Sequence, residues 1–311
     1  MKLIRLVPDN TKFRFMAYRR ITFSGSLTLL VASIMLFFML GLNQGIDFQG
    51  GTLFQLQNKA GPADLARIRQ SLGTLGLGDV QVQNFGEPDQ VLIRIERQPG
   101  GDAGQEEAEK KVRDVFGDTV VYERVEVVGP RVSGELARAG TISVVASLLA
   151  VLVYIWFRFE WQFAAGAVAA LIHDVLLTIG MFSLVRLEFN LSSIAAILTI
   201  VGYSLNDTVV VYDRIRENLR KYKKMPIGQI IDDSVNQTLS RTTLTSVTTL
   251  IALIALYVFG GEIIRSFTFA MIFGVVVGTY SSIFIAAPIL IFLNLRPGAD
   301  ADEPAEAAQT A

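Results

Sequence analysis

The side chains best suited to chemistry in this chain are ionisable groups that interrupt long apolar runs. Asp207 follows Asn206 in the segment IVGYSLNDTVVVYDRIREN, residues 200–218, and Arg241 directly precedes the next apolar run. A charge at membrane depth costs about 2.5–3.5 kcal/mol on insertion scales, so it usually faces a bundle interior and marks a functional site. Because a nearby cation favours an ionised carboxyl and desolvation opposes it, such a pair can load and release a proton.

A second ionisable pair, His173 and Asp174, lies in AALIHDVLLTIG, residues 169–180. Adjacent residues point about 100° apart around a helix, so we expect each to find a partner elsewhere rather than to pair with the other. The predicted proton relay therefore comprises Asp207, Arg241, Asp174 and His173. The static alternatives are an interhelical hydrogen bond for Asp207 or His173, and an Arg241 side chain that extends to the membrane surface.

Polar side chains near these groups could support the relay. We assign this role to Asn206, Ser240, Thr242 and Thr245. Hydroxyls can line a wet path or hydrogen-bond between helices, and simple packing is an equal alternative for each one singly.

Composition narrows the energy source. The chain has 311 residues, no cysteine and one histidine, which excludes cysteine metal sites and disulfides and leaves no zinc-type spacing. GIDFQGG, residues 45–51, lacks the Lys-Ser/Thr that a P-loop needs. We expect no enzyme, no metal and no cofactor, with protons as the coupling ion.

Long apolar runs are the elements that must position these groups. Hydrophobic residues make up 51% of the chain, and a bilayer core of about 30 Å needs about 20 helical residues. Six runs qualify as transmembrane helices, at 21–41, 141–157, 163–185, 191–212, 242–259 and 266–293. At about 1.5 Å per residue, Asp207 lies about 24 Å from Leu191, and Arg241 about 27 Å from Phe259. The two groups are therefore predicted at similar depth.

The last run carries a predicted packing face of Ala270, Gly274, Gly278 and Ser282 at four-residue steps. Pro288 is expected to bend the same helix.

Charge sets the orientation. Residues 1–20 contain six Lys/Arg and the connection 213–241 contains seven, whereas Arg186 and Arg265 stand alone in the other two short connections. The positive-inside rule places residues 1–20 and 213–241 in the cytoplasm and residues 42–138 outside. We expect a multi-pass membrane protein with both termini cytoplasmic, helices two to six within 139–295, and a disordered tail at 296–311.

Residues 42–138, which we call the αβ domain, have a globular pattern. Strands are predicted at 51–57, 79–85, 90–96 and 119–128, with amphipathic helices at 62–75 and 104–116. The order β-α-β-β-α-β predicts a ferredoxin-like domain. In the motif containing Asp47, Gly50 and Gly51, the glycines let the chain turn from membrane helix to strand, and Gly129 and Pro130 end the last strand.

Five segments together resemble the SecF family of the bacterial Sec translocon. They are GIDFQGGT, VVGPRVSGEL, IHDV, VGYSLNDTVVVYDRIREN and NQTLSRTTLTS, and the resemblance spans about residues 15–295. It implies six helices of the resistance-nodulation-division (RND) type with a domain between the first two. The family's helix-four aspartate corresponds to Asp207, and its helix-five arginine to Arg241.

The resemblance also implies partners. A SecF subunit acts with SecD, which supplies six further helices and an aspartate of the proton path, and assists SecYEG, with YajC and YidC as further expected partners. The substrate is a preprotein; membrane lipid surrounds the helices, and no nucleic acid is involved. Two alternatives stay open, an RND-type exporter of small molecules or lipids and a passive scaffold that stabilises SecD. The small αβ domain disfavours a drug pump.

Overall fold

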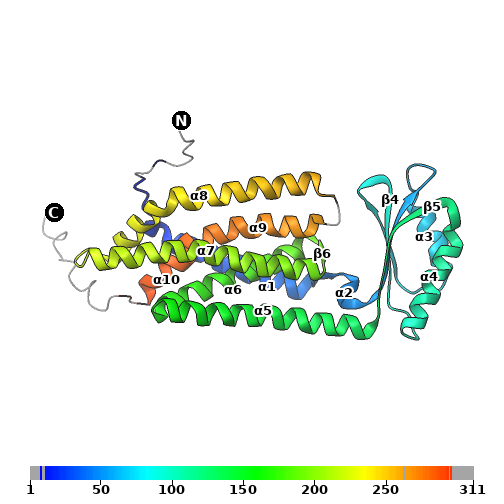
Figure 1. The fold of residues 1–311 in the computed structure, drawn as a ribbon, viewed down its shortest axis with the longest axis horizontal. Coiled ribbons are helices and arrows are strands. Elements are labelled where there is room, and N and C mark those ends of the chain that lie inside the picture. The colour runs from blue at the N-terminus through cyan, green and yellow to red at the C-terminus, as the bar shows by residue number, and fades with distance from the viewer. Residues whose placement is uncertain (1–7, 9–10, 262–263, 294, 296–311) are drawn as a thin grey trace.

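A computed structural model describes residues 8, 11–261, 264–293 and 295. The molecule is elongated, with a helix bundle at one end and the αβ domain at the other (Figure 1). The tail expected at 296–311 and most of the first ten residues lie outside the described residues.

Within the described part of the chain, six helices are long and apolar enough to cross a membrane, which confirms the six predicted spans. They correspond to α1 Arg19–Leu40, α5 Pro130–Arg158, α6 Trp161–Val185, α7 Leu191–Lys221, α8 Ile227–Phe259 and α9 Arg265–Ser281, the last of which belongs to a span that runs on to Phe292. A short 3₁₀ helix, η1 Phe15–Tyr18, precedes α1. Helices α7 and α8 extend well into the segment 213–241 expected as a connecting loop, because charged residues end an apolar run without ending a helix.

Three of the six helices form the centre of the bundle. In the most apolar stretch of each span, 61% of the residues in α6, 56% in the α9 span and 44% in α7 are buried, whereas only 11% are buried in each of α1, α5 and α8. The predicted packing face of α9 meets α7 directly. A Cβ atom on Gly274 would lie 2.3 Å from Ile200, and one on Gly278 would lie 2.9 Å from Ser204. The glycines therefore allow close approach at the depth of the ionisable groups.

Helix α9 continues through a π-helical segment, Ser282–Ala286, into α10 Ala287–Phe292. Pro288 lies near the start of α10 and has no backbone N–H to donate. The Tyr212 hydroxyl of α7 donates to the Ala286 carbonyl at 3.0 Å. A π-helical change of winding therefore lies just before Pro288, where a bend is predicted, and the Tyr212 hydroxyl stabilises it.

The αβ domain has the predicted order of elements. Strands β2 Gly51–Asn58, β3 Val80–Phe85, β4 Glu87–Ile95 and β5 Val120–Val128 form one antiparallel sheet in the order β3-β4-β2-β5, with helices α3 Leu65–Gly73 and α4 Asp102–Phe116. A 3₁₀ turn, η2 Gly117–Thr119, separates α4 from β5. This is the ferredoxin-like arrangement. Tyr122 of β5 packs under the helices, and its burial raises the pKa of its hydroxyl.

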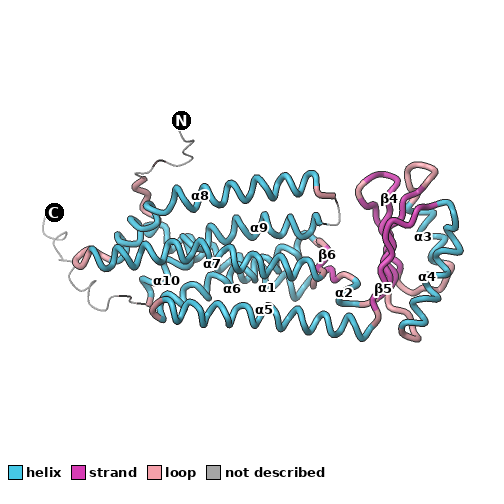
Figure 2. The backbone as a smooth tube through the Cα atoms, viewed as in Figure 1, coloured by secondary structure: helices cyan, strands magenta, loops and turns pink. Residues whose placement is uncertain are grey.

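One face of the sheet packs on α3 and α4, and the other face is turned toward the bundle (Figure 2). Phe54, Ile93 and Leu72 are fully buried in the core on the helix side. Between sheet and bundle lie a four-residue helix, α2 Ile46–Gln49, and two short strands, β1 Asn43–Gln44 and β6 Glu188–Phe189, which pair in parallel. These short elements connect the two parts of the molecule.

Candidate functional site

Asp174 is the most completely bonded ionisable side chain in the bundle. It is fully buried midway along α6. Its Oδ2 accepts hydrogen bonds from the Ser204 hydroxyl of α7 at 2.6 Å and the Ser281 hydroxyl of α9 at 2.7 Å. Its Oδ1 lies 2.9 Å from Nδ1 of His173. Asp174 therefore joins the three central helices through one carboxyl group.

The expectation that His173 and Asp174 do not pair with each other is wrong. The angle of about 100° between adjacent residues describes the Cα–Cβ directions, and both side chains rotate beyond that point. The Asp174 carboxyl group turns toward α7 and α9, and the imidazole follows it. The spacing along the helix determines the directions of the two Cα–Cβ bonds, but it does not determine the side-chain rotamers of His173 and Asp174.

The other face of the His173 ring lies toward α1 and α9. The ring stacks on Tyr280, with centroids 6.4 Å apart, and the Tyr280 hydroxyl lies 3.0 Å from the Ser26 hydroxyl of α1. His173 Nε2 is buried and has no hydrogen-bond partner among the described residues. Asp174 and His173 thus form a polar cluster that reaches from α1 to α7.

Asp207 lies on a different side of α7 and is bonded far more weakly. The side chain is only 2% exposed. Among the described residues, its one hydrogen bond comes from the Thr279 hydroxyl of α9 at 3.4 Å, near the upper limit for such a bond. Thr279 also lies 2.8 Å from the Ser246 hydroxyl of α8, which accepts from the Tyr203 hydroxyl at 3.3 Å. The carboxyl group thus ends a chain of hydroxyls across α7, α8 and α9.

Arg241 lies beside Asp207 without forming an ion pair with it. Its guanidinium is close enough to attract the carboxylate, yet the side chain is exposed on α8. Together with exposed Asn206, it lines a groove of about 410 Å³ between α7 and α8. The predicted similarity in depth is consistent with this placement. The arginine therefore faces outward from the bundle beside a buried acid.

The predicted supporting hydroxyls of α8 have local partners or none. Thr245 donates to the Arg241 carbonyl on its own helix at 3.0 Å. Thr242 is buried, and its hydroxyl has no partner among the described residues. Ser240 is half-buried. Ser246, which the sequence analysis did not single out, is an α8 hydroxyl that does reach other helices, at Tyr203 of α7 and Thr279 of α9.

Sequence reasoning missed the hydroxyls that actually contact the two carboxyl groups. They are Ser204, Ser281 and Thr279. Ser204 lies three residues before Asp207 in the same apolar run, a spacing that places both on adjoining faces of one helix. The two α9 residues belong to TYSS, residues 279–282. A search for polar side chains in every apolar run would have found them.

The glycine motif connects the αβ domain to α7. Asp47 Oδ2 accepts from the backbone N–H of Leu191, the first residue of α7, at 2.9 Å, a contact that suits a carboxylate at a helix N-terminus. Gly51 has φ of 125°, and a Cβ there would lie 2.3 Å from the Ile95 carbonyl, so only glycine fits. The predicted turn from membrane helix to strand is made by α2 and Gly50.

At the same end of the sheet, where Gly51 pairs with Val128, Gly129 is the N-cap residue of α5 and Pro130 is its first residue. A Cβ on Gly129 would lie 2.4 Å from the Asp102 carboxyl group. The pair therefore ends β5 as predicted and starts the second membrane helix at once.

Two regions of this chain match family models of known proteins. Residues 107–296 match the family described as protein export membrane protein SecD/SecF, C-terminal, and residues 36–57 match the SecD/SecF GG motif. The chain belongs to the SecD/SecF family. It is 47% identical over 301 residues to the protein translocase subunit SecF of Rickettsia bellii, covering 94% of this chain and 97% of that protein. SecF of Cereibacter sphaeroides is 46% identical over 307 residues, covering 95% and 94%.

Longer members of the SecD/SecF family contain a region similar to this chain. The protein translocase subunit SecDF of Brucella abortus is 47% identical over 294 residues, which cover 94% of this chain but 39% of that protein. The crystal structure of SecDF from Thermus thermophilus matches with a TM-score of 0.84 and 34% identity, over 94% of this chain and 40% of that one. A SecDF structure in a super-membrane-facing form matches with a TM-score of 0.70 and 33% identity, over 97% and 41%.

Proposed function

We propose that this chain is an auxiliary subunit of the Sec protein-export machinery that acts with SecD and uses the proton motive force to promote preprotein translocation across the inner membrane. Membership of the SecD/SecF family supports the export role. Relatives named SecDF contain a similar region within a longer chain, of which this chain covers 39%. The remaining length of such relatives is where a SecD counterpart would lie.

The observation that carries the proton-driven mechanism is the contrast between the two buried aspartates. Asp174 has three partners within 2.9 Å, which fix its position. Asp207 has one partner at 3.4 Å and lies next to a groove lined by Arg241. A weakly held acid beside a cation can change protonation without breaking the helix bundle. Asp207 is therefore the proposed proton carrier, and Asp174 with His173 holds the helices that position it.

The face of α7 next to Asp207 supports the partnership with SecD. Most exposed side chains in the outer helices are large and apolar, as lipid requires. The exposed stripe of α7 instead consists of Ser192, Ala195, Thr199, Gly202 and Asn206. Small and polar residues at membrane depth are typical of helix–helix contacts. Helices of SecD would cover this stripe and close the groove that holds Arg241, which would complete the proton path.

Protonation can then move the αβ domain. A proton on Asp207 removes its attraction for Arg241, so α7 and α8 can shift relative to one another. The first residue of α7 is bonded to Asp47 at the start of the αβ domain, which transmits the shift. The αβ domain lies on the outer side in this proposal, with both termini cytoplasmic, and contacts the emerging preprotein near SecYEG, YajC and YidC. The gradient drives the cycle only if the two states take up and release protons on opposite sides.

The test is an Asp207→Asn variant assembled with SecD and SecYEG in membrane vesicles. Export of a preprotein is measured with and without a proton gradient. The variant is expected to lose the stimulation by the gradient and to keep the basal export that needs none. Glu135→Gln, which changes an exposed carboxyl group on α5 that pairs with Arg131, is the control. Full stimulation in Asp207→Asn would contradict proton carriage and would favour a passive scaffold.

A further inference from the structure

An ion pair crosses the boundary between the αβ domain and the membrane helices. Arg94 extends from β4, and its Nη2 lies 2.7 Å from Oε2 of Glu188 in β6, between α6 and α7. Arg94 Nη1 also donates to the Gln44 carbonyl of β1 at 3.3 Å. The two charged side chains are only 12% and 23% exposed. This is a shielded contact between two parts of the fold rather than a surface ion pair.

The local backbone is built to hold Glu188 at this point. Strands β1 and β6 pair in parallel, with Asn43 opposite Glu188. A Cβ on Gly45 would lie 2.6 Å from the Glu188 carboxyl oxygen, so the absence of a side chain there leaves room for the carboxylate. The glutamate therefore lies on a short, fixed strand at the end of the bundle.

Weak apolar contact accompanies the ion pair. Ile46 of α2 packs with Leu53 of β2 and Leu92 of β4 in a small cluster. A polar cleft of about 330 Å³ opens between the sheet face and the ends of α6, α7 and α9. Because the apolar cluster is small and the cleft is polar, apolar burial alone gives little to fix the angle of the domain.

We propose that Arg94 and Glu188 form a latch that holds the αβ domain against the end of α7, and that breaking this pair lets the domain tilt away. The claim concerns domain docking in the isolated chain, so it stands or falls independently of proton carriage by Asp207. Both latch residues are positioning residues.

The physics of a shielded pair predicts that each single substitution costs more than the double substitution. Removing one partner of a buried ion pair leaves the other charge uncompensated, whereas replacing both is often tolerated. Burial raises the pKa of Glu188, and Arg94 offsets part of that rise. A carboxylate without Arg94 therefore loses this offset, and an amide at 188 leaves the Arg94 guanidinium without its partner. Other charged groups that face Glu188 or line the cleft are Asp47, Glu126, Arg124, Arg186 and Arg265.

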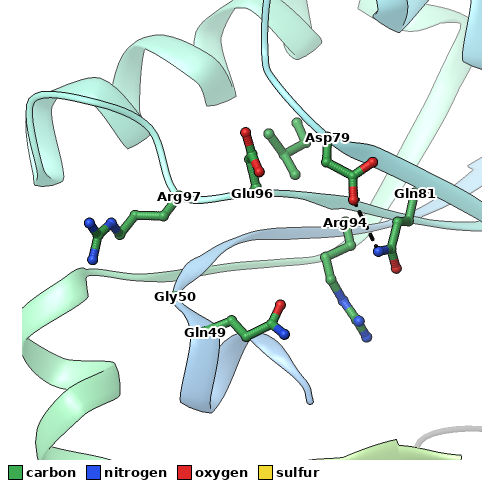
Figure 3. A pocket seen from close by; sticks show the side chains of 8 residues that line it. Gln49, Gly50, Asp79, Gln81, Arg94, Glu96 and Arg97 are labelled. Carbon is green, nitrogen blue, oxygen red and sulfur yellow. Dashed lines mark hydrogen bonds between the residues drawn. The ribbon is translucent and has the colours of Figure 1, made fainter. Parts of the chain in front are cut away.

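Water can reach the latch from the side. A pocket of about 340 Å³ lies beside Arg94, lined also by Gln49, Gly50, Asp79, Gln81, Ile95, Glu96 and Arg97 (Figure 3). In it, Gln81 donates to Asp79 at 3.2 Å. Glu188 itself lines the polar cleft between the sheet and the bundle, which is where a proton can reach it.

The absence of cysteine makes a distance measurement direct. The full chain in nanodiscs carries two spin labels, one at Lys110→Cys on α4 and one at Val258→Cys on α8. Double electron–electron resonance gives the distribution of distances between the two labels. Arg94→Gln, Glu188→Gln and the double variant are compared with the parent. Arg131→Gln is the matched control, because its pair with Glu135 is 92% and 70% exposed.

Arg94→Gln is expected to lower the ratio of docked to tilted population by about tenfold or more, which corresponds to about 1.4 kcal/mol. Glu188→Gln should lower this ratio as well, because it leaves the Arg94 guanidinium unpaired, whereas Arg131→Gln should keep the parent distance and the double variant should recover most of the docked population. Lowering the pH should also restore docking in Arg94→Gln, because the uncompensated carboxyl group takes a proton. Parent-like distances in Arg94→Gln, or a double variant as tilted as Arg94→Gln alone, would overturn the latch.

Discussion

Replacing Asp174 by alanine tests the assignment of this residue to holding the bundle together. The substitution removes two hydrogen bonds from serine hydroxyls, at 2.6 Å and 2.7 Å, and one contact with His173 at 2.9 Å. Hydrogen bonds between membrane helices contribute about 0.6 kcal/mol each on average and about 1.7 at most. Three contacts therefore predict a loss of about 2 kcal/mol, with about 5 kcal/mol as the upper end.

Unfolding in increasing mole fractions of SDS, followed by far-ultraviolet circular dichroism, measures this loss. Asp174→Asn should lose less than the alanine variant, because the amide can still accept from one serine. Asp207→Asn should change the unfolding free energy by no more than about 0.6 kcal/mol, since its one hydrogen bond is 3.4 Å long. Asp213→Ala, at an exposed helix position, is the control for loss of a carboxyl group.

The comparison between the two aspartates decides the reasoning. If Asp207→Asn destabilises the chain as much as Asp174→Ala, then Asp207 is itself a structural residue and the contrast in hydrogen bonding has no functional meaning. If Asp174→Ala unfolds like the parent, the hydrogen bonds in the cluster are offset by their desolvation, and the assignment of Asp174 to helix positioning fails.

Gly278→Val should separate α9 from α7, because even a Cβ would lie 2.9 Å from Ser204; lower thermal stability is expected, and unchanged melting would contradict this close contact. Leu72→Ala in the αβ core should cost about 2–5 kcal/mol in a domain-specific unfolding transition; a loss below that range would show that the site collapses around the cavity.

The sequence alone was enough to predict the six spans and the order of the αβ domain. The thickness of the bilayer sets the length of an apolar helical segment, and the spacing of apolar residues in strands and helices is a local pattern. Both can therefore be recognised in the sequence without knowledge of how the chain packs. The small-residue face of α9 was predictable for the same reason, because its four-residue spacing is local. The helix ends at Lys221 and Ile227 were not, since a charged residue can continue a helix beyond the membrane.

The relay was only partly accessible from the sequence. Counting residues along each predicted helix placed Asp207 and Arg241 at similar depth in the membrane. The free-energy cost of a charged group at membrane depth singled out Asp174. Which side of α7 each carboxyl group faces depends on how α6, α8 and α9 pack around it. The contacts of Ser204, Ser281 and Thr279 with the two carboxyl groups therefore became visible only in three dimensions.

The sequence by itself determined what kinds of groups lie at membrane depth, because composition and periodicity act along the chain. The tertiary structure decided that the Asp174 carboxyl group is held by several hydrogen bonds and that the Asp207 carboxyl group is held by one long bond. Hydrogen bonds depend on side-chain rotamers and on neighbours that are far apart in sequence. It also revealed the contact between Arg94 and Glu188, which are separated along the chain by α4, β5 and two membrane helices. No local pattern encodes such a contact, since it forms only when the sheet and the bundle meet.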